Sequence, residues 1–166
     1  MTNSKQFKKL FTFNIDEFNK LIPNLGCILG LDLGEKRIGV AISDINRSFA
    51  TSLKNIERSK LINDIRIIES VISNNDISAI IVGRPVNLNG KPGKKAQSIR
   101  RLAEEINKTL KLPLLFWDER YSSQAVEKIM IQELDLSRSK RKNLIDSSAA
   151  SWILEGALKR IKINKI

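Results

Sequence analysis

The chain has 166 residues, of which 42% are hydrophobic and 28% charged; this fits one globular domain and includes no apolar run of the ~20 residues that cross a bilayer. Lys and Arg outnumber Asp and Glu by 29 to 18, so the formal net charge of +11 favours an anionic partner such as nucleic acid. The chain has no histidine, which excludes imidazole as a general base or metal ligand. Its single cysteine, Cys27, excludes an intramolecular disulfide and a multi-cysteine zinc site.

Residues 1–26 are predicted to be an N-terminal extension that contains a short helix. Asn14 and Glu17 have the spacing of a capping box, apolar residues recur at helical intervals after them, and Pro23 ends the helix. The basic start leads into a polar segment rather than an apolar core, so we expect no secretory signal. The prediction is a cytoplasmic protein with no membrane partner.

Residues 27–166 are predicted to form one domain in which apolar alternation and helical periodicity follow one another. A strand over 28–33, a turn and a second strand over 37–43 predict a hairpin. The later elements are, in chain order, a strand over 48–56, a helix from 61 to about 74, a strand over 78–83, a helix from 96 to 110, a strand over 113–118, and helices from 123 and from about 140.

This order predicts an α/β fold with a mixed five-stranded sheet and helices on both faces. Short connections make the first three strands antiparallel, whereas helical crossovers make the later strands parallel. No internal repeat or linker divides the domain.

Two aspartates occupy positions where apolar residues are expected. Asp32 shares a strand face with Ile28 and Gly30, and Asp146 begins a helical stripe that continues through Ala150 and Ile153. A buried carboxylate needs a compensating cation, which is either a metal ion or a nearby Lys or Arg. Salt bridges from Asp32 to Lys36 or Arg37, and a helix-dipole role for Asp146, are the structural alternatives.

Asp118 and Glu119 follow at the end of the predicted fifth strand. Successive strand residues point to opposite faces, so only one of the two carboxylates can lie in a site with Asp32. We predict that it is Glu119, with Asp118 as the alternative. Three carboxylates without His or Cys suit Mg²⁺ or Mn²⁺, which activate water and stabilise the leaving oxygen in phosphodiester hydrolysis.

A loop rich in Gly, Pro and Lys, residues 84–95, follows the strand over 78–83. Its cations and exposed backbone N–H groups are suited to phosphate contacts, and its position at the C-terminal end of a strand favours that role over the alternative of a solvated surface loop. Further basic residues stand at Arg100, Arg101, Arg138, Lys140, Arg141 and Lys142.

Four ordered segments resemble the signature blocks of the YqgF/RuvX family. They are Gly30 to Ala41, Val82-Gly83-Arg84-Pro85 with Gly90, Asp118 to Ser123, and Asp146 to Ala150 with Ile153-Leu154. The resemblance covers about residues 28–155. It implies a ribonuclease-H-like fold and a nuclease role in maturation of the pre-16S rRNA 5′ end, with the ribosomal small-subunit precursor as an expected partner.

The resemblance implies that Asp32, Glu119 and Asp146 are the catalytic and metal-binding residues, with Mg²⁺ or Mn²⁺ as cofactor. Many ribonuclease-H-like enzymes carry another carboxylate at the end of the fourth strand, where this chain has Gly83-Arg84-Pro85. We expect a monomer or a weak homodimer. The expected nucleic-acid contacts are Lys36, Arg37, Arg84, Lys94, Lys95, Arg100, Arg120 and Arg141.

Three other functions would account for parts of this sequence. The same superfamily includes resolvases of four-way DNA junctions, which share the chemistry. An ATP-binding protein of the actin-like superfamily also has an Asp-x-Gly hairpin like Asp32-Leu33-Gly34, but it needs two such lobes. A non-catalytic RNA-binding assembly factor would need the positive charge but not the inward-facing acids.

Overall fold

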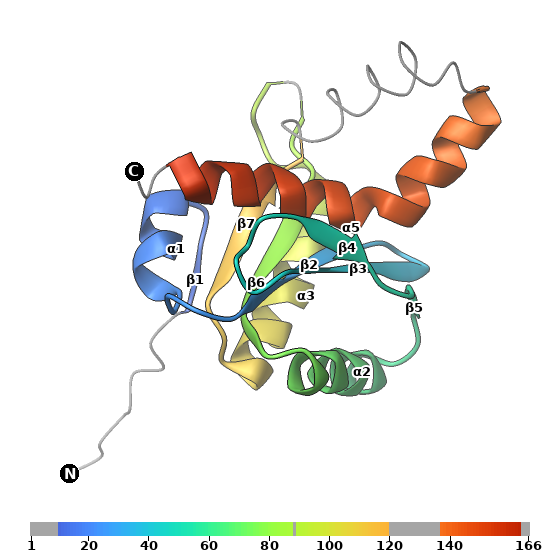
Figure 1. The fold of residues 1–166 in the computed structure, drawn as a ribbon. Coiled ribbons are helices and arrows are strands. Elements are labelled where there is room, and N and C mark those ends of the chain that lie inside the picture. Colours follow the sequence, from blue (N-terminus) through green and yellow to red (C-terminus); the bar gives the residue numbers. More distant parts are fainter. Residues whose placement is uncertain (1–9, 88, 120–136, 164–166) are drawn as a thin grey trace.

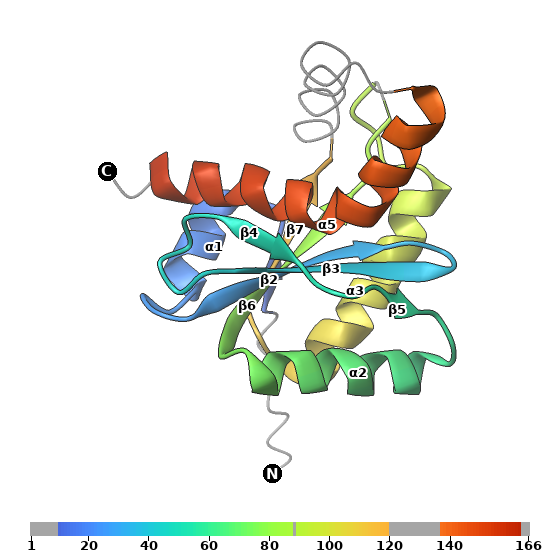
Figure 2. The ribbon, with the colours of Figure 1, turned by 45° about the vertical axis from the view of Figure 1, so that its right-hand side comes forward.

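A computed structural model describes residues 10–87, 89–119 and 137–163, with the side chains of residues 138–148 and 163 excepted. These residues form three layers, with a twisted sheet between helices on its two faces (Figure 1). Helices α2 and α3 cover one face, whereas α5 lies across the other face beside α1 (Figure 2). None of the helices in this described part of the chain is long and apolar enough for a membrane crossing.

The sheet has the strand order β1-β7-β6-β2-β3-β4, with β5 paired to β3 beside β4. Strands β1, β7, β6 and β2 are parallel neighbours, and β3 runs antiparallel to β2, β4 and β5. The strand bounds are Phe11–Thr12 for β1, Cys27–Leu33 for β2, Arg37–Ser43 for β3, Ala50–Ser52 for β4, Ile56–Glu57 for β5, Ile77–Arg84 for β6 and Leu114–Asp118 for β7.

The helices are α1 (Ile15–Leu21), α2 (Leu61–Asn74), α3 (Lys94–Leu110) and α5 (Arg138–Ile163). Because α2 and α3 are the crossovers that lead into β6 and β7, they make these strands parallel to β2. In α5 the C-terminal part packs on the sheet, and the N-terminal part extends beyond its edge (Figure 1).

The two faces of the sheet bury alternate residues of each strand. Leu29 and Leu31 of β2 face α2 and α3, whereas Ile28 of β2 and Ile81 of β6 face α5. On the α5 face, the approach of helix and sheet is close: a Cβ on Gly30 would lie 2.9 Å from the Leu154 Cβ. Glycine at this position therefore sets the distance between α5 and the sheet.

The N-terminal segment is part of the core. Strand β1 pairs in parallel with β7, and the α1 residue Phe18 is fully buried against α5 and the sheet. The side chain of Asn14 caps α1 by accepting hydrogen bonds from the backbone N–H groups of residues 16 and 17. Buried Arg47 stabilises the segment between α1 and β2, because its guanidinium donates hydrogen bonds to the backbone oxygens of Pro23 and Gly26.

The predicted mixed α/β sheet with helices on both faces is confirmed, with two differences in strand number. Residues 48–56, predicted as one strand, contribute two short strands, β4 and β5, because the chain leaves the β3 edge between them. The described residues also include β1, which was not predicted. The predicted helix from residue 123 lies outside the described residues.

Replacing Phe18 tests whether the N-terminal segment belongs to the core. The Phe18→Ala variant should lose about 3–5 kcal/mol of the free energy of unfolding, because it leaves a cavity between α1, α5 and the sheet. The matched variant Phe49→Ala removes an equally large side chain that is 58% exposed, and it should lose less than about 1 kcal/mol. Denaturant unfolding measures both, and equal losses would mean that the segment is not integrated.

Candidate active site

Asp32 lies one residue before the end of β2 on the face covered by α5. It shares that face with Ile28, which is buried against α5, and it is opposite Gly39 of β3 in the ladder. A Cβ on Gly39 would lie 3.2 Å from the Asp32 Cβ and 3.4 Å from the Ala150 Cβ of α5. The partly buried carboxylate of Asp32 therefore occupies the space that the helix and the glycine leave at the sheet.

Glu119 reaches the same face from the end of β7. Its backbone N–H donates to the Arg84 oxygen at 3.1 Å, which holds it beside the last residue of β6. A Cβ on Gly83 would lie 2.8 Å from the Glu119 Oε1 and would also collide with Ile153 of α5. The carboxylate thus lies over β6, between the sheet and α5, because position 83 carries no side chain.

The charge of Asp32 acts on Glu119. The pKa of Glu119 is raised from the ordinary 4.5 to about 7, mainly by burial and further by the negative charges of Asp32 and Asp118, against the opposing effect of Lys95. Folding therefore brings three carboxylates and one lysine within electrostatic range near the carboxyl ends of β2 and β7. Near neutral pH the ionised form of Glu119 is therefore disfavoured unless a positive charge compensates it.

The structure gives the orientation of Asp118, but for Asp146 it gives only the position of the backbone on α5. Strand alternation puts Asp118 on the face of Phe116, which is buried against α2 and α3, and so away from α5. Asp146 belongs to α5, one helical turn before Ala150, which is buried against the sheet; the side chain of Asp146 itself lies outside the described residues. In the described part of the chain no three acidic, histidine or cysteine side chains form a group that could hold a metal.

The predicted nucleic-acid contacts are spread over three elements near this edge. Lys36 and Arg37 are exposed at the turn between β2 and β3, and Lys94, Lys95 and Arg100 are exposed on α3. Arg84 is partly buried at the end of β6. Arg120 and the side chain of Arg141 lie outside the described residues.

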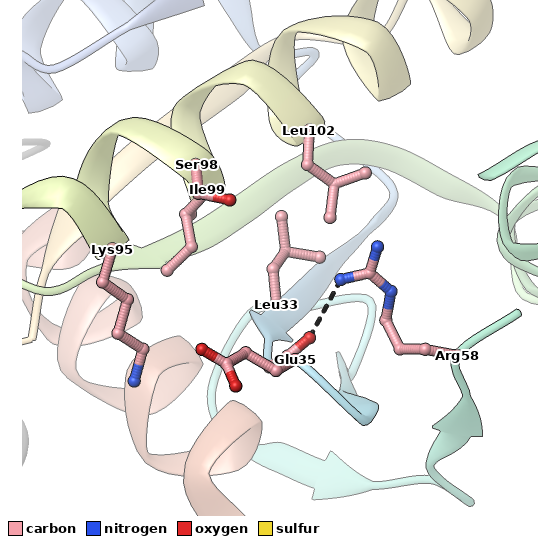
Figure 3. A pocket seen from close by; sticks show the side chains of 8 residues that line it. Leu33, Glu35, Arg58, Lys95, Ser98, Ile99 and Leu102 are labelled. Carbon is pink, nitrogen blue, oxygen red and sulfur yellow. Dashed lines mark hydrogen bonds between the residues drawn. The ribbon is translucent and has the colours of Figure 1, made fainter. Parts of the chain in front are cut away.

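A small pocket of about 70 Å³ opens beside the turn that follows β2 (Figure 3). Leu33, Ile99 and Leu102 form its apolar part, and Lys95 and Glu35 reach it from opposite elements. Lys95 therefore belongs both to this pocket and to the electrostatic surroundings of Glu119.

Arg58 is a residue of this pocket that the sequence analysis missed. Its guanidinium donates to the Gly34 oxygen at 3.0 Å and pairs with the buried carboxylate of Asp64 at 3.3 Å. The backbone N–H of Gly34 in turn donates to the backbone oxygen of Asp32, so Arg58 fixes the turn that follows this residue. No periodic pattern links these residues, because Arg58 and Gly34 are 24 positions apart.

Comparison with known proteins gives the family. The sequence profile described as "RuvX: Holliday junction resolvase" matches residues 26–160. The chain belongs to the RuvX family. A relative from Rhodobacter capsulatus, named "Putative pre-16S rRNA nuclease", is 44% identical over 147 residues, which cover 89% of this chain and 92% of the relative. Membership of this nuclease family makes the chain a hydrolase of phosphodiester bonds.

Solved structures agree on the fold. Thermus thermophilus RuvC in complex with a Holliday junction has a TM-score of 0.52 and 10% identity, covering 82% of this chain and 96% of RuvC. The yeast mitochondrial Holliday junction resolvase Ydc2 has a TM-score of 0.53 and 12% identity, covering 91% of this chain and 85% of Ydc2. The ribonuclease-H-like fold expected from the resemblance is thereby confirmed.

The raised pKa of Glu119 predicts a pH-dependent stability in the metal-free protein. The folded state binds the proton more tightly than the unfolded state, so stability decreases as pH rises from about 4.5 to about 7. Glu119→Gln cannot ionise, and in chelator it should be more stable than the parent protein by about 1–3 kcal/mol at pH 8. Near pH 4 the two proteins should be almost equally stable.

Glu105→Gln is the matched control, because Glu105 is exposed on α3 and the same change should leave stability nearly unaffected at both pH values. Thermal melting at several pH values measures the difference. A Glu119→Gln variant that melts below the parent at pH 8 would mean that the carboxylate stabilises the fold instead.

Proposed function

We propose that this protein is a metal-dependent endonuclease that processes the 5′ end of pre-16S rRNA during ribosome biogenesis. The observation that carries the proposal is the electrostatic contact of Asp32 and Glu119 between α5 and the sheet, in a chain of the RuvX family. The curated relatives at 39–44% identity bear the pre-16S rRNA name, which favours the RNA substrate. We assign residues 27–166 to the nuclease domain and residues 1–26 to an N-terminal extension. The proposed location of the protein is the cytoplasm.

A second candidate substrate is a four-way DNA junction, which the family description and the titles of the RuvC and Ydc2 structures name. The phosphodiester chemistry would be the same. A non-catalytic RNA-binding factor is disfavoured, because such a protein would have no need for two interacting carboxylates on a mostly apolar face. The expected assembly state is a monomer or a weak homodimer.

The donor set fits Mg²⁺ or Mn²⁺. Asp32 and Glu119 offer only carboxylate oxygens, their mutual repulsion is relieved by a cation, and Asp146 is assigned as the third ligand from its position on α5. When bound, the ion supplies an activated water and stabilises the leaving oxygen. The chain's own residues hold this arrangement: Arg58 fixes the turn after Asp32, and the backbone of Arg84 fixes Glu119.

We assign the Lys and Arg side chains around the site as contacts for the phosphates of the nucleic-acid backbone. Lys95 acts on Glu119 electrostatically and also lines the pocket beside β2, so a phosphate near Lys95 would be close to the acids. The full set of proposed contacts is Lys36, Arg37, Arg84, Lys94, Lys95, Arg100, Arg120 and Arg141.

Removing single carboxylates tests the catalytic assignment. Asp32→Asn and Asp146→Asn should bind a pre-16S rRNA fragment at least as tightly as the parent, because the amide removes negative charge near the phosphates. Both should lose metal-dependent cleavage by about 100-fold or more, since the amide no longer holds the cation. Single-turnover cleavage with Mg²⁺ and with Mn²⁺ measures this, on the RNA fragment and on a four-way DNA junction.

Asp76→Asn is the matched control, because Asp76 is exposed at the opposite edge of the sheet and asparagine accepts its positive φ of 49°. Its cleavage rate should equal that of the parent. Full activity of Asp32→Asn or Asp146→Asn would contradict the assignment of that residue. If the parent protein cleaved the DNA junction but not the RNA fragment, the four-way junction would become the first candidate substrate in place of pre-16S rRNA.

Charge reversal tests the role of the start of α3. The double variant Lys94→Glu with Lys95→Glu should bind RNA at least about tenfold more weakly, and the salt dependence of binding should fall by about one to two phosphate contacts. The control Lys108→Glu with Lys159→Glu changes the net charge equally at exposed positions near the C-terminal ends of α3 and α5. Equal losses in both variants would show only an effect of net charge.

A further inference from the structure

The residue that follows β1, Phe13, is 42% exposed although it is stacked on a core aromatic ring. Its ring lies parallel to that of Phe116, with centroids 4.7 Å apart and an interplanar angle of 15°. Phe11 contacts both rings edge to face, at 6.4 Å from Phe13 and 5.7 Å from Phe116. The three rings form a rigid cluster at the end of the sheet, with Phe13 as its outermost member.

Two guanidinium groups lie over the ring of Phe13. The Cζ of Arg84 is 4.9 Å from the ring centroid, and the Cζ of Arg100 is 5.3 Å from it. They come from the end of β6 and from α3, so three separate segments meet here. Arg100 also pairs with Glu104, whereas Arg84 has no ion pair with any described residue. We call Phe13, Arg84 and Arg100 the Phe13 platform.

The platform lies at the same edge of the sheet as the acids but on the α3 face. Arg84 connects the two, because its backbone oxygen accepts from the Glu119 N–H at 3.1 Å while its side chain is over Phe13. The preceding residue, Gly83, faces the carboxylate of Glu119 on the α5 side. A polynucleotide that passes over this edge would therefore contact the platform close to the acids.

We propose that the Phe13 platform binds an unpaired base of the nucleic-acid strand beside the cleavage site. This rests on the proposed nuclease function and specifies the substrate further, as one with a single-stranded segment next to the scissile phosphate. An exposed aromatic ring and guanidinium planes are surfaces on which unpaired bases stack, and the guanidinium charges pair with phosphates. Bases inside a duplex are already stacked on their neighbours and cannot use such a platform.

A purely structural role for Phe13 would explain less of the geometry. Covering the apolar face of the Phe116 ring requires only apolar bulk, which leucine would also supply. The platform instead exposes part of an aromatic ring and gathers two cations beside it, in a protein with a net charge of +11. Ring and cations together are complementary to a base and its phosphate, and to no apolar partner.

The test compares binding of the full chain to two probes in chelator, so that no cleavage occurs. The probes are a labelled 12-nucleotide single-stranded RNA and the same sequence in an RNA duplex. Phe13→Leu should weaken binding of the single strand about tenfold and leave duplex binding within about twofold of the parent. Phe13→Trp keeps a stacking surface and should restore single-strand binding. Phe49→Leu, at an exposed phenylalanine away from the platform, should change neither.

Arg100→Lys separates stacking from charge. Lysine keeps the positive charge but not the planar guanidinium, so single-strand affinity should fall while its salt dependence stays the same. The proposal is overturned if Phe13→Leu binds the single strand like the parent, if it weakens both probes equally, or if Phe13→Trp fails to restore binding. Thermal melting of each variant identifies a loss that comes from unfolding, and Phe13→Trp then decides.

Failure of the platform and failure of the nuclease proposal are distinguishable. Metal-dependent cleavage by the parent protein tests the nuclease proposal and does not depend on Phe13. A single-strand preference that Phe13→Leu abolishes supports the platform whether or not the parent cleaves, because that measurement is made without metal.

Discussion

The carboxylates of Asp32 and Glu119 are held within range of each other's charge in the narrow space between the sheet and α5, and the local structure is arranged around this repulsion. Glycine at 39 and 83 leaves room for the two side chains, and the backbone of Arg84 holds Glu119 in place. Each unit by which burial and the neighbouring charges raise the pKa of Glu119 corresponds to about 1.4 kcal/mol of destabilisation of its ionised form. The apolar residues that α5 buries against the sheet offset this, so the core stabilises an arrangement that the acids alone would oppose.

The sheet lies between the pair of interacting acids and the two arginines of the Phe13 platform. The two interacting acids lie on the α5 face, whereas Arg84 and Arg100 meet over Phe13 on the α3 face. Both groups are at the carboxyl ends of parallel strands, where the chain's crossovers begin and where side chains from several segments converge. A polyanion attracted by the cations therefore approaches the acids from the side, and the acids repel it until a cation neutralises them.

Much of this could be predicted from local patterns. The alternation around Ile28 and Gly30 placed Asp32 on a helix-covered face, and the same rule separated Asp118 from Glu119. Contacts that no periodicity records were missed. The two residues of β1 are too few to show alternation, and the strand predicted over 48–56 divides into β4 and β5. Arg58 and Phe13 contact the site region only through pairings that the folded sheet creates.

The N-terminal segment is built into the sheet and the core, although most of it lies outside the residues that the family model matches. The family match begins at residue 26, yet β1 extends the sheet beyond β7 and Phe18 fills the core under α5. Because β1 is parallel to β7, the residue after it emerges at the same edge as Glu119, which brings Phe13 beside Arg84. The proposed acids are carried by β2, by the end of β7 and by α5, and β3 and β6 supply the glycines and the backbone contact beside Asp32 and Glu119. Under the proposals made for the two sites, the segment affects which strand is held at this edge, whereas Asp32, Glu119 and Asp146 lie within the residues that the family model matches.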